Sequence, residues 1–164
     1  MHEQHERIAK YCAMKRSLTW LALAIVATGA TACSSSTNGG TPAPPPACLA
    51  EVGATGALVF PAQNASNVPD NLAQVIIATT TTLPAGWDIE LFTTGGFLVA
   101  VSAGNLGPAP NPLPTPNTIP PFPNPIYQSG TGFGTLPAAT TLQVGINNSG
   151  SGCVPTIVGV FTTQ

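Results

Sequence analysis

Charged side chains are the scarcest component of this chain of 164 residues. They make up 6% of the sequence, whereas a typical soluble domain has roughly 25%. All four cationic side chains and both histidines precede residue 17, so the chain has no Lys, Arg or His from Ser17 to Gln164. That region therefore lacks the base of a Ser-His-Asp or Cys-His catalytic set, a histidine ligand for zinc or haem, and a cation that neutralises phosphate. We expect no catalytic residue, no cofactor, no metal site and no nucleic-acid partner.

The carboxylates of that region are few: Glu51, Asp70, Asp88 and Glu90. Asp88 and Glu90 stand two residues apart in an alternating segment, so both are expected to face water on one side of a strand. An exposed strand face gives neither the cleft nor the raised pKa that an acid–base pair requires. The sequence thus favours a non-catalytic protein, and a carbohydrate-active enzyme that uses only carboxylates is an alternative.

Residues 1–32 have the organisation of a secretory signal peptide. Met14-Lys15-Arg16 is a short basic region, Leu18–Ala27 is an apolar run, and Ala30-Thr31-Ala32 is a small-residue cleavage site. The apolar run is shorter than the about 20 residues that a transmembrane helix needs. Acidic residues precede the basic region, which favours Met14 as the start of translation.

Cys33 follows the cleavage site directly, and Ala30-Thr31-Ala32-Cys33 resembles the lipobox of bacterial lipoproteins. The resemblance implies that Cys33 is acylated and becomes the mature N-terminus, so that the lipid anchors the protein to a membrane. Ser34 follows the cysteine, which by the same resemblance implies the outer membrane or cell surface rather than the inner membrane. Ala30 stands where members most often have Leu. Ordinary secretory cleavage before Cys33 is the alternative.

Residues 33–47 are expected to form a linker, because a Ser/Thr/Gly-rich stretch is followed there by a proline-rich one. Removing residues 1–32 leaves Cys33, Cys48 and Cys153, an odd number in an oxidising compartment. Lipidation of Cys33 leaves Cys48 and Cys153 as a pair. They flank the terminal predicted strands, which often lie close together in a sandwich, so we expect a disulfide. Two unpaired buried thiols are the alternative.

Residues 48–164 have the pattern of an all-β domain. Short segments rich in Val, Ile, Phe and Thr are separated by Gly, Pro and Asn, and no segment keeps a helical period for three turns. About seven strands in just over a hundred residues predict an immunoglobulin-like antiparallel β-sandwich. The predicted strands are Ala57–Phe60, Ala73–Thr80, Trp87–Phe92, Phe97–Ser102, Ile126–Ser129, Thr140–Ile146 and Thr156–Thr162.

Alternation assigns the faces of three of these strands. Trp87, Ile89 and Leu91 are expected in the core, as are Leu142, Val144 and Ile146. In the last strand Ile157, Gly159 and Phe161 share one face, and Val158 and Val160 share the other. We therefore expect this last strand to be covered on both faces.

Three segments resemble the bacterial immunoglobulin-like domains. Residues 60–71, with Pro61 and Val68-Pro69, are similar to their opening strand and turn; residues 136–144 are similar to the corner before their penultimate strand; and Phe161-Thr162-Thr163 is similar to their closing strand. The resemblance implies a spacer or binding module of the cell envelope, without catalysis. Leu142 stands where an aromatic residue is usual, so the tyrosine-corner hydrogen bond is not expected here.

Residues 108–125 interrupt the strand pattern, because nine of these eighteen residues are proline. Proline has no N–H to donate to a ladder, so the segment is expected to be a semi-rigid loop. One interpretation is a recognition loop with Ile119 and Phe122 as apolar contacts for a protein or glycan ligand. The interpretation that the sequence favours is an insertion folded against its own domain.

Taken together, these features predict an exported envelope lipoprotein with a non-catalytic immunoglobulin-like binding or spacer domain. A second hypothesis is a structural envelope component that assembles with itself. It rests on the near absence of charge and on the apolar last strand, since surface charge normally protects edge strands.

Overall fold

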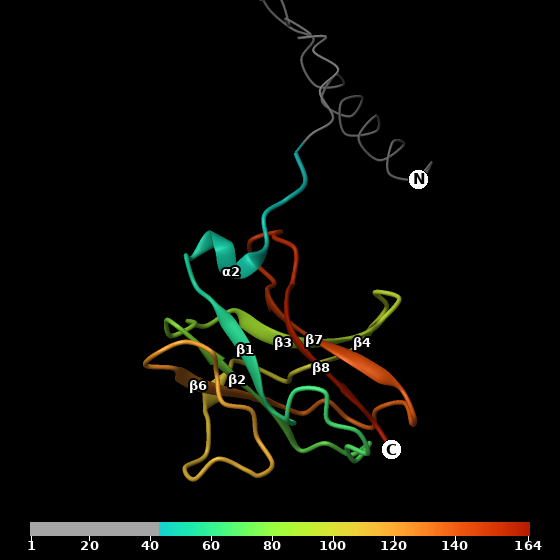
Figure 1. Ribbon diagram of the computed structural model, residues 1–164. Coiled ribbons are helices and arrows are strands. Elements are labelled where there is room, and N and C mark those ends of the chain that lie inside the picture. The colour runs from blue at the N-terminus through green and yellow to red at the C-terminus, as the bar shows by residue number, and fades with distance from the viewer. Residues whose placement is uncertain (1–42) are drawn as a thin grey trace, which may run out of the picture. The chain divides into compact units, whose positions relative to one another are not determined.

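The computed structural model describes residues 43–164 (Figure 1). Strand-forming residues dominate this part of the chain, and eight strands form after one short helix. In chain order the elements are α2 (Cys48–Glu51), β1 (Gly56–Phe60), β2 (Gln74–Thr79), β3 (Trp87–Thr93), β4 (Leu98–Val101), β5 (Gly107–Pro108), β6 (Ile126–Thr131), β7 (Thr141–Asn148) and β8 (Thr156–Thr162).

The strands form two four-stranded antiparallel sheets that pack as a β-sandwich. One sheet has the order β1-β2-β6-β5 and the other the order β4-β3-β7-β8. With the strands lettered A, B, C, C′, D, E, F and G along the chain, these orders are ABED and C′CFG, which is the arrangement of an immunoglobulin-like sandwich. The predicted fold class is confirmed, and all seven predicted strands form within two residues of their expected ends.

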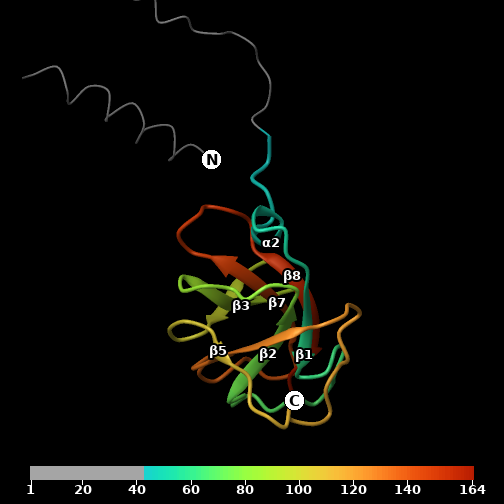
Figure 2. The ribbon, with the colours of Figure 1, turned by 90° about the vertical axis from the view of Figure 1, so that its left-hand side faces the viewer.

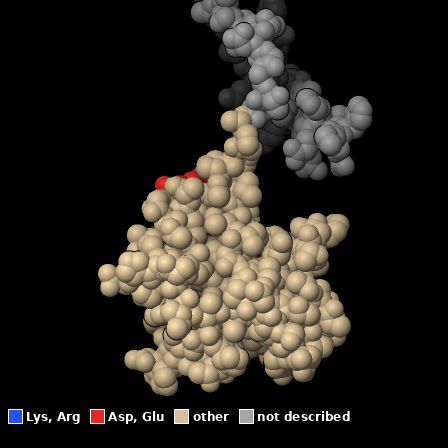
Figure 3. Space-filling view, in the orientation of Figure 1, with Lys and Arg blue, Asp and Glu red and all other residues tan. Residues whose placement is uncertain are grey.

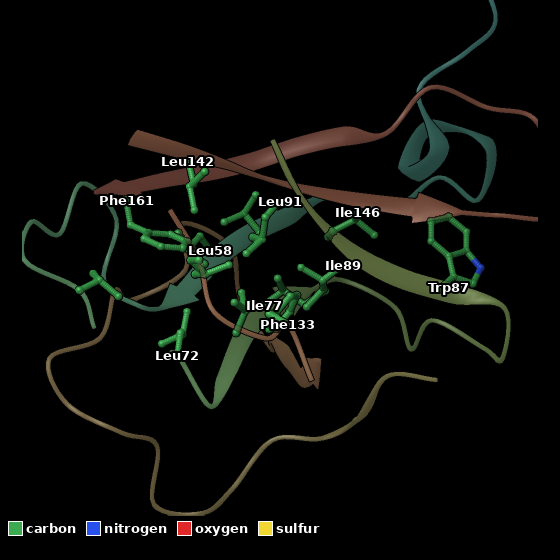
Figure 4. Packing of buried hydrophobic residues seen from close by; sticks show 14 of the residues in the cluster. Leu58, Leu72, Ile77, Trp87, Ile89, Leu91, Phe133, Leu142, Ile146 and Phe161 are labelled. Atoms are coloured by element: carbon green, nitrogen blue, oxygen red, sulfur yellow. The ribbon is translucent and has the colours of Figure 1, made fainter. Parts of the chain in front are cut away.

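The core lies between the sheets and consists of the residues that alternation assigns to it. Trp87, Ile89 and Leu91 of β3 are buried. The inward-facing residues of β7, which are Leu142, Val144 and Ile146, are fully buried. Figure 4 shows Ile89 and Leu91 close to Leu58 and Ile77 of the opposite sheet. Phe161 and Trp87 lie at opposite ends of this layer.

The expectation that the last strand is covered on both faces, with Ile157 on the same face as Phe161, is wrong for Ile157. The register between β7 and β8 shifts at this point, because Val144 pairs with Gly159 while the next residue, Gly145, pairs with Ile157. The extra residue Val158 bulges, and a bulge reverses the faces of the residues beyond it. As a result Val158 packs against the core and Ile157 is exposed.

A second apolar cluster lies on the outer face of the β1-β2-β6-β5 sheet. Val59, Ile76 and Ala78 are fully buried there, although their strand neighbours face the main core. The proline-rich segment covers them: Ala109, Leu113 and Phe122 pack on this cluster. Figure 2 shows the segment between β5 and β6 running around the lower ends of β2 and β1. We call this sheet the covered sheet.

The edges of the covered sheet are also occupied. The N–H of Thr118, in the proline-rich segment, donates to the carbonyl of Val59 in β1 at 2.9 Å. At the other edge, β5 ends in Pro108, which has no N–H to offer to a further strand. The two-residue β5 was not predicted, because its pairing with β6 is long-range and its proline argues against a strand.

The residues before β2 cover the free edge of β8. The N–H of Asn64 donates to the carbonyl of Val160 at 2.8 Å, and the N–H of Thr162 donates to the carbonyl of Ala65 at 2.8 Å. The N–H of Val160 also donates to the side-chain oxygen of Gln63 at 3.2 Å. The last strand is therefore not an open edge, which removes the support that it gave to self-assembly.

Candidate functional site

A disulfide fixes the beginning of the domain. Cys48 and Cys153 are bonded, with Cα atoms 5.0 Å apart, so the predicted pairing is confirmed. The backbone strengthens this junction, because the N–H of Cys48 donates to the carbonyl of Val154 and the N–H of Val154 donates to the carbonyl of Pro46, both at 2.9 Å. The chain preceding the domain therefore leaves from a defined point beside the β7–β8 connection.

The other elements of the predicted anchor lie outside the described residues. These are the predicted signal peptide 1–32, the predicted lipidation site Cys33 and the expected linker up to residue 42. In residues 43–164, none of the helices has the length and apolar character needed to cross a bilayer. The last residues of the linker, 43–46, are exposed and carry no helix or strand.

Asp88 and Glu90 share the outer face of β3, as alternation predicts, but neither is fully exposed to water. Both side chains are half-buried, and Asp88 Oδ1 is shielded from solvent without a hydrogen-bond donor in the described structure. Burial, and secondarily the neighbouring charge of Glu90, raises the pKa of Asp88. Asn147 lies opposite Asp88 in the ladder but donates its side-chain N–H to Glu90 Oε1 at 2.9 Å. The side-chain amide opposite Asp88 thus donates to Glu90 and leaves Asp88 Oδ1 without a donor.

Asp88 also lines a small recess at the end of β3. The recess has a volume of about 230 Å³, below the range of roughly 300–1,000 Å³ of ordinary small-molecule sites. Glu90 is not among the residues that line this recess, so the two carboxylates do not share a cleft there. The recess is lined by Gly86, Trp87, Asp88, Ser102, Gly104, Asn105 and Ser149.

The two apolar residues that the sequence predicts as ligand contacts, Ile119 and Phe122, have different environments in the proline-rich segment. Phe122 packs on the second apolar cluster, whereas Ile119 is 87% exposed. The segment is therefore folded against its own domain, as the favoured interpretation has it. Ile119 is therefore the large apolar side chain of this segment that is exposed to solvent.

Within residues 43–164, no apolar cluster comparable to the second cluster lies on the outer face of the β4-β3-β7-β8 sheet, and we call it the open sheet. Leu98 and Val101 of β4 and Ile157 of β8 are exposed large apolar residues there. Between them the ring of Phe92 lies over Gly145, where an added Cβ would meet Phe92 Cε2 at 2.8 Å. A large exposed apolar patch on a monomeric protein often marks an interaction site.

Strand β4 is also the free edge of the open sheet. It pairs with β3, and its other side meets no strand in the described part of the chain. Sequence reasoning missed this edge, although one signal was present: residues 91–102 contain no charge and no proline. These are the residue types that normally block edge-to-edge pairing.

Acidic side chains contribute little to the surface. On the face shown in Figure 3, Asp and Glu atoms gather near α2 and the remainder is uncharged. No group of three or more His, Cys, Asp or Glu side chains that could hold a metal ion occurs within residues 43–164. The surface therefore offers apolar and hydrogen-bonding contacts rather than charge.

Comparison of the chain with protein-family models, with curated proteins and with solved structures found no match.

Proposed function

We propose that the chain is an exported bacterial lipoprotein, anchored through Cys33 to the outer membrane or cell surface, whose immunoglobulin-like domain acts as a non-catalytic binding or spacer module. The observation that carries the proposal is the order of basic region, apolar run and Ala30-Thr31-Ala32-Cys33 at the N-terminus. The disulfide supports it, because disulfides persist in oxidising compartments outside the cytoplasm.

The linker is suited to holding a domain close to a membrane. A flexible chain of the length of residues 33–46 spans about 20 Å on average. Its prolines stiffen the part next to the domain, and the disulfide with the Pro46–Val154 hydrogen bond fixes where it joins. The domain would therefore keep one end toward the bilayer and expose its sides to the surroundings.

The bacterial immunoglobulin-like family is the proposed identity of the domain. The ABED and C′CFG strand order supports it, as do the turn after β1 and the corner before β7. In the corner, Thr163 Oγ1 donates to the carbonyl of Pro137 and accepts from the N–H of Thr140 at 2.9 Å. These bonds hold the corner where the family uses a tyrosine hydroxyl.

A binding or spacer role agrees with the side chains available for chemistry. The described residues contain no His, Lys or Arg, so carboxylates are the remaining side-chain general bases. Glu90 is occupied by Asn147, and Asp88 faces a recess too small for a glycan chain. We propose no reaction for this pair.

Mass spectrometry of the protein isolated from membranes tests the anchor. We expect a mature N-terminus at Cys33 carrying diacylglycerol on sulfur, and release of the protein into the soluble fraction when Cys33 is changed to Ser. Ser36→Ala is the matched control, because it changes a nearby residue of the predicted linker, leaves every cysteine in place and should leave the protein in the membrane fraction. An unmodified Cys33 thiol in protein from membrane-free supernatant would contradict the proposal.

A further inference from the structure

The open edge at β4 is an exception among the strand edges of this domain. The edge of β8 is hydrogen-bonded to residues 63–65, that of β1 accepts a bond from Thr118, and that of β5 ends in proline. Strand β4 carries no such cover in the described structure. Its sequence, Leu98-Val99-Ala100-Val101, has neither charge nor proline.

The side chains of β4 divide between the core and the solvent. Val99 and Ala100 pack toward the core, whereas Leu98 is 54% and Val101 is 38% exposed. The turn before β4 projects from the body of the domain (Figure 1) and ends in Phe97, which is 76% exposed. An open strand edge with apolar side chains beside it is a template for adding another strand.

We propose that this edge pairs with the same strand of a second copy of the chain. The two β4 strands run antiparallel about a twofold axis between Val99 and Ala100. Leu98 then lies opposite the partner's Val101, and the same contact occurs twice, as an isologous interface requires. The two open sheets join into one sheet of eight strands.

The scarcity of charge at this edge favours a second copy over a charged partner. The described residues contain no cation, so an acidic partner finds nothing to pair with. A basic partner finds one carboxylate near this edge, Glu90, which is half-buried and lies on the neighbouring strand opposite Val101. Two uncharged β4 edges meet without repulsion and offer each other unpaired backbone groups.

The protection of the other strand edges limits the assembly to a closed pair. Each copy has one open edge in its described part, so pairing at β4 leaves no edge on which a fibre can grow. A bulge at Val99, where Leu98 and Ala100 pair with adjacent residues of β3, keeps the regular ladder short. Four paired residues bury less area than the about 1,200 Å² of stable complexes, so the pair is a weak one. Confinement of the copies to one surface strengthens such an interface by raising their effective concentration.

Cysteine cross-linking of the full chain tests the register. Cells that produce Leu98→Cys and Val101→Cys chains together should give a disulfide-linked dimer on a non-reducing gel, several-fold more abundant than in cells producing either variant alone. Cys48 and Cys153 are already bonded, and both β4 variants also carry Cys33→Ser in a parallel experiment, so that a cross-link through Cys33 is recognised. Ile157→Cys is the matched control, because it places a thiol at an exposed apolar position of the same sheet on a different strand.

Two results would overturn the proposal. One is the absence of a dimer in cells that make both β4 variants while the Cys48–Cys153 bond is intact, which shows that the domain has folded. The other is an equally strong dimer with Ile157→Cys, which would mean that the outer face rather than the edge associates. The dimer band is measured in the membrane fraction and in the soluble fraction. Loss of the lipid anchor changes the fraction that contains the protein, whereas loss of the pairing removes the dimer band.

Discussion

The two sheets of this sandwich carry almost no charge, and they differ in how their outer faces and edges are protected from contact with other chains. The covered sheet has Phe122 and its neighbours over its outer face, and it closes both edges with proline or with a backbone bond from the proline-rich segment. In residues 43–164 the open sheet has no comparable apolar cluster on its outer face, and the outer edge of β4 pairs with no strand. Soluble proteins usually protect such surfaces with Lys and Glu, which this domain almost lacks. The difference identifies the open sheet as the side available for contacts.

The largest effect on stability is expected from removal of the disulfide. This bond links the start of the domain to the β7–β8 connection of the open sheet. Replacing Cys48 and Cys153 together by Ser removes a cross-link that closes a loop of 105 residues. The chain-entropy model gives a loss of about 4–5 kcal/mol in the free energy of unfolding. Urea unfolding of both proteins measures it.

The control for the disulfide is a reducing agent. It should lower the stability of the unchanged protein and leave the double Ser variant unaffected. If the two proteins unfold at the same urea concentration without reductant, the open sheet does not depend on this cross-link.

An intermediate effect is expected on the covered sheet from Phe122→Ala. The ring packs on the second apolar cluster, so its loss should cost about 1–3 kcal/mol. Ile119→Ala is the matched control in the same segment and should change stability by less than about 0.5 kcal/mol, because Ile119 is exposed. Thermal unfolding compares the two, and equal losses would mean that the segment does not cover the sheet through Phe122.

The smallest effect on stability is expected from replacing Asp88 by Asn. Its pKa in the folded protein lies above the ordinary value of 3.8, because burial and then Glu90 disfavour the charge. The folded state therefore retains the proton longer than the unfolded chain does, and the contribution of Asp88 to stability falls as the pH rises from 3.8 through the raised pKa. Asp88→Asn should be more stable than the unchanged protein at pH 7, by less than about 1 kcal/mol since water screens a half-exposed group.

Melting temperatures at several pH values test this sign. The advantage of Asp88→Asn should vanish at pH values below 3.8, where Asp88 is protonated in both states. Asp70→Asn controls for the loss of one negative charge elsewhere in the domain. An Asp88→Asn variant less stable than the unchanged protein at neutral pH would show that the carboxylate is favourably bound.

Local patterns predicted most of the fold. Alternation placed Ile89 and Leu142 in the core, and the positions of Cys48 and Cys153 beside terminal strands predicted their bond. The errors arose where distant segments meet. The bulge that turns Ile157 outward depends on the pairing with β7, and the burial of Asp88 depends on what surrounds the end of β3.

The candidate surface was the least predictable feature for the same reason. The last strand is apolar and looked open, but residues 63–65 cover it from almost a hundred positions away. Strand β4 has an ordinary sequence, and its exposure follows from its place at the end of the sheet order. Which edge is open depends on tertiary contacts that no local pattern contains.

Hydrogen exchange of the mature protein at low and high concentration tests the contrast between the sheets most directly. The N–H groups of Val160 and Thr162 in β8 should exchange slowly at both concentrations, because residues 63–65 accept their hydrogen bonds. Exchange in Leu98–Val101 should be fast when the protein is dilute and should slow several-fold when it is concentrated, while the covered sheet stays unchanged. Exchange in β4 that is independent of concentration, or slowing that is spread evenly over both sheets, would contradict the account.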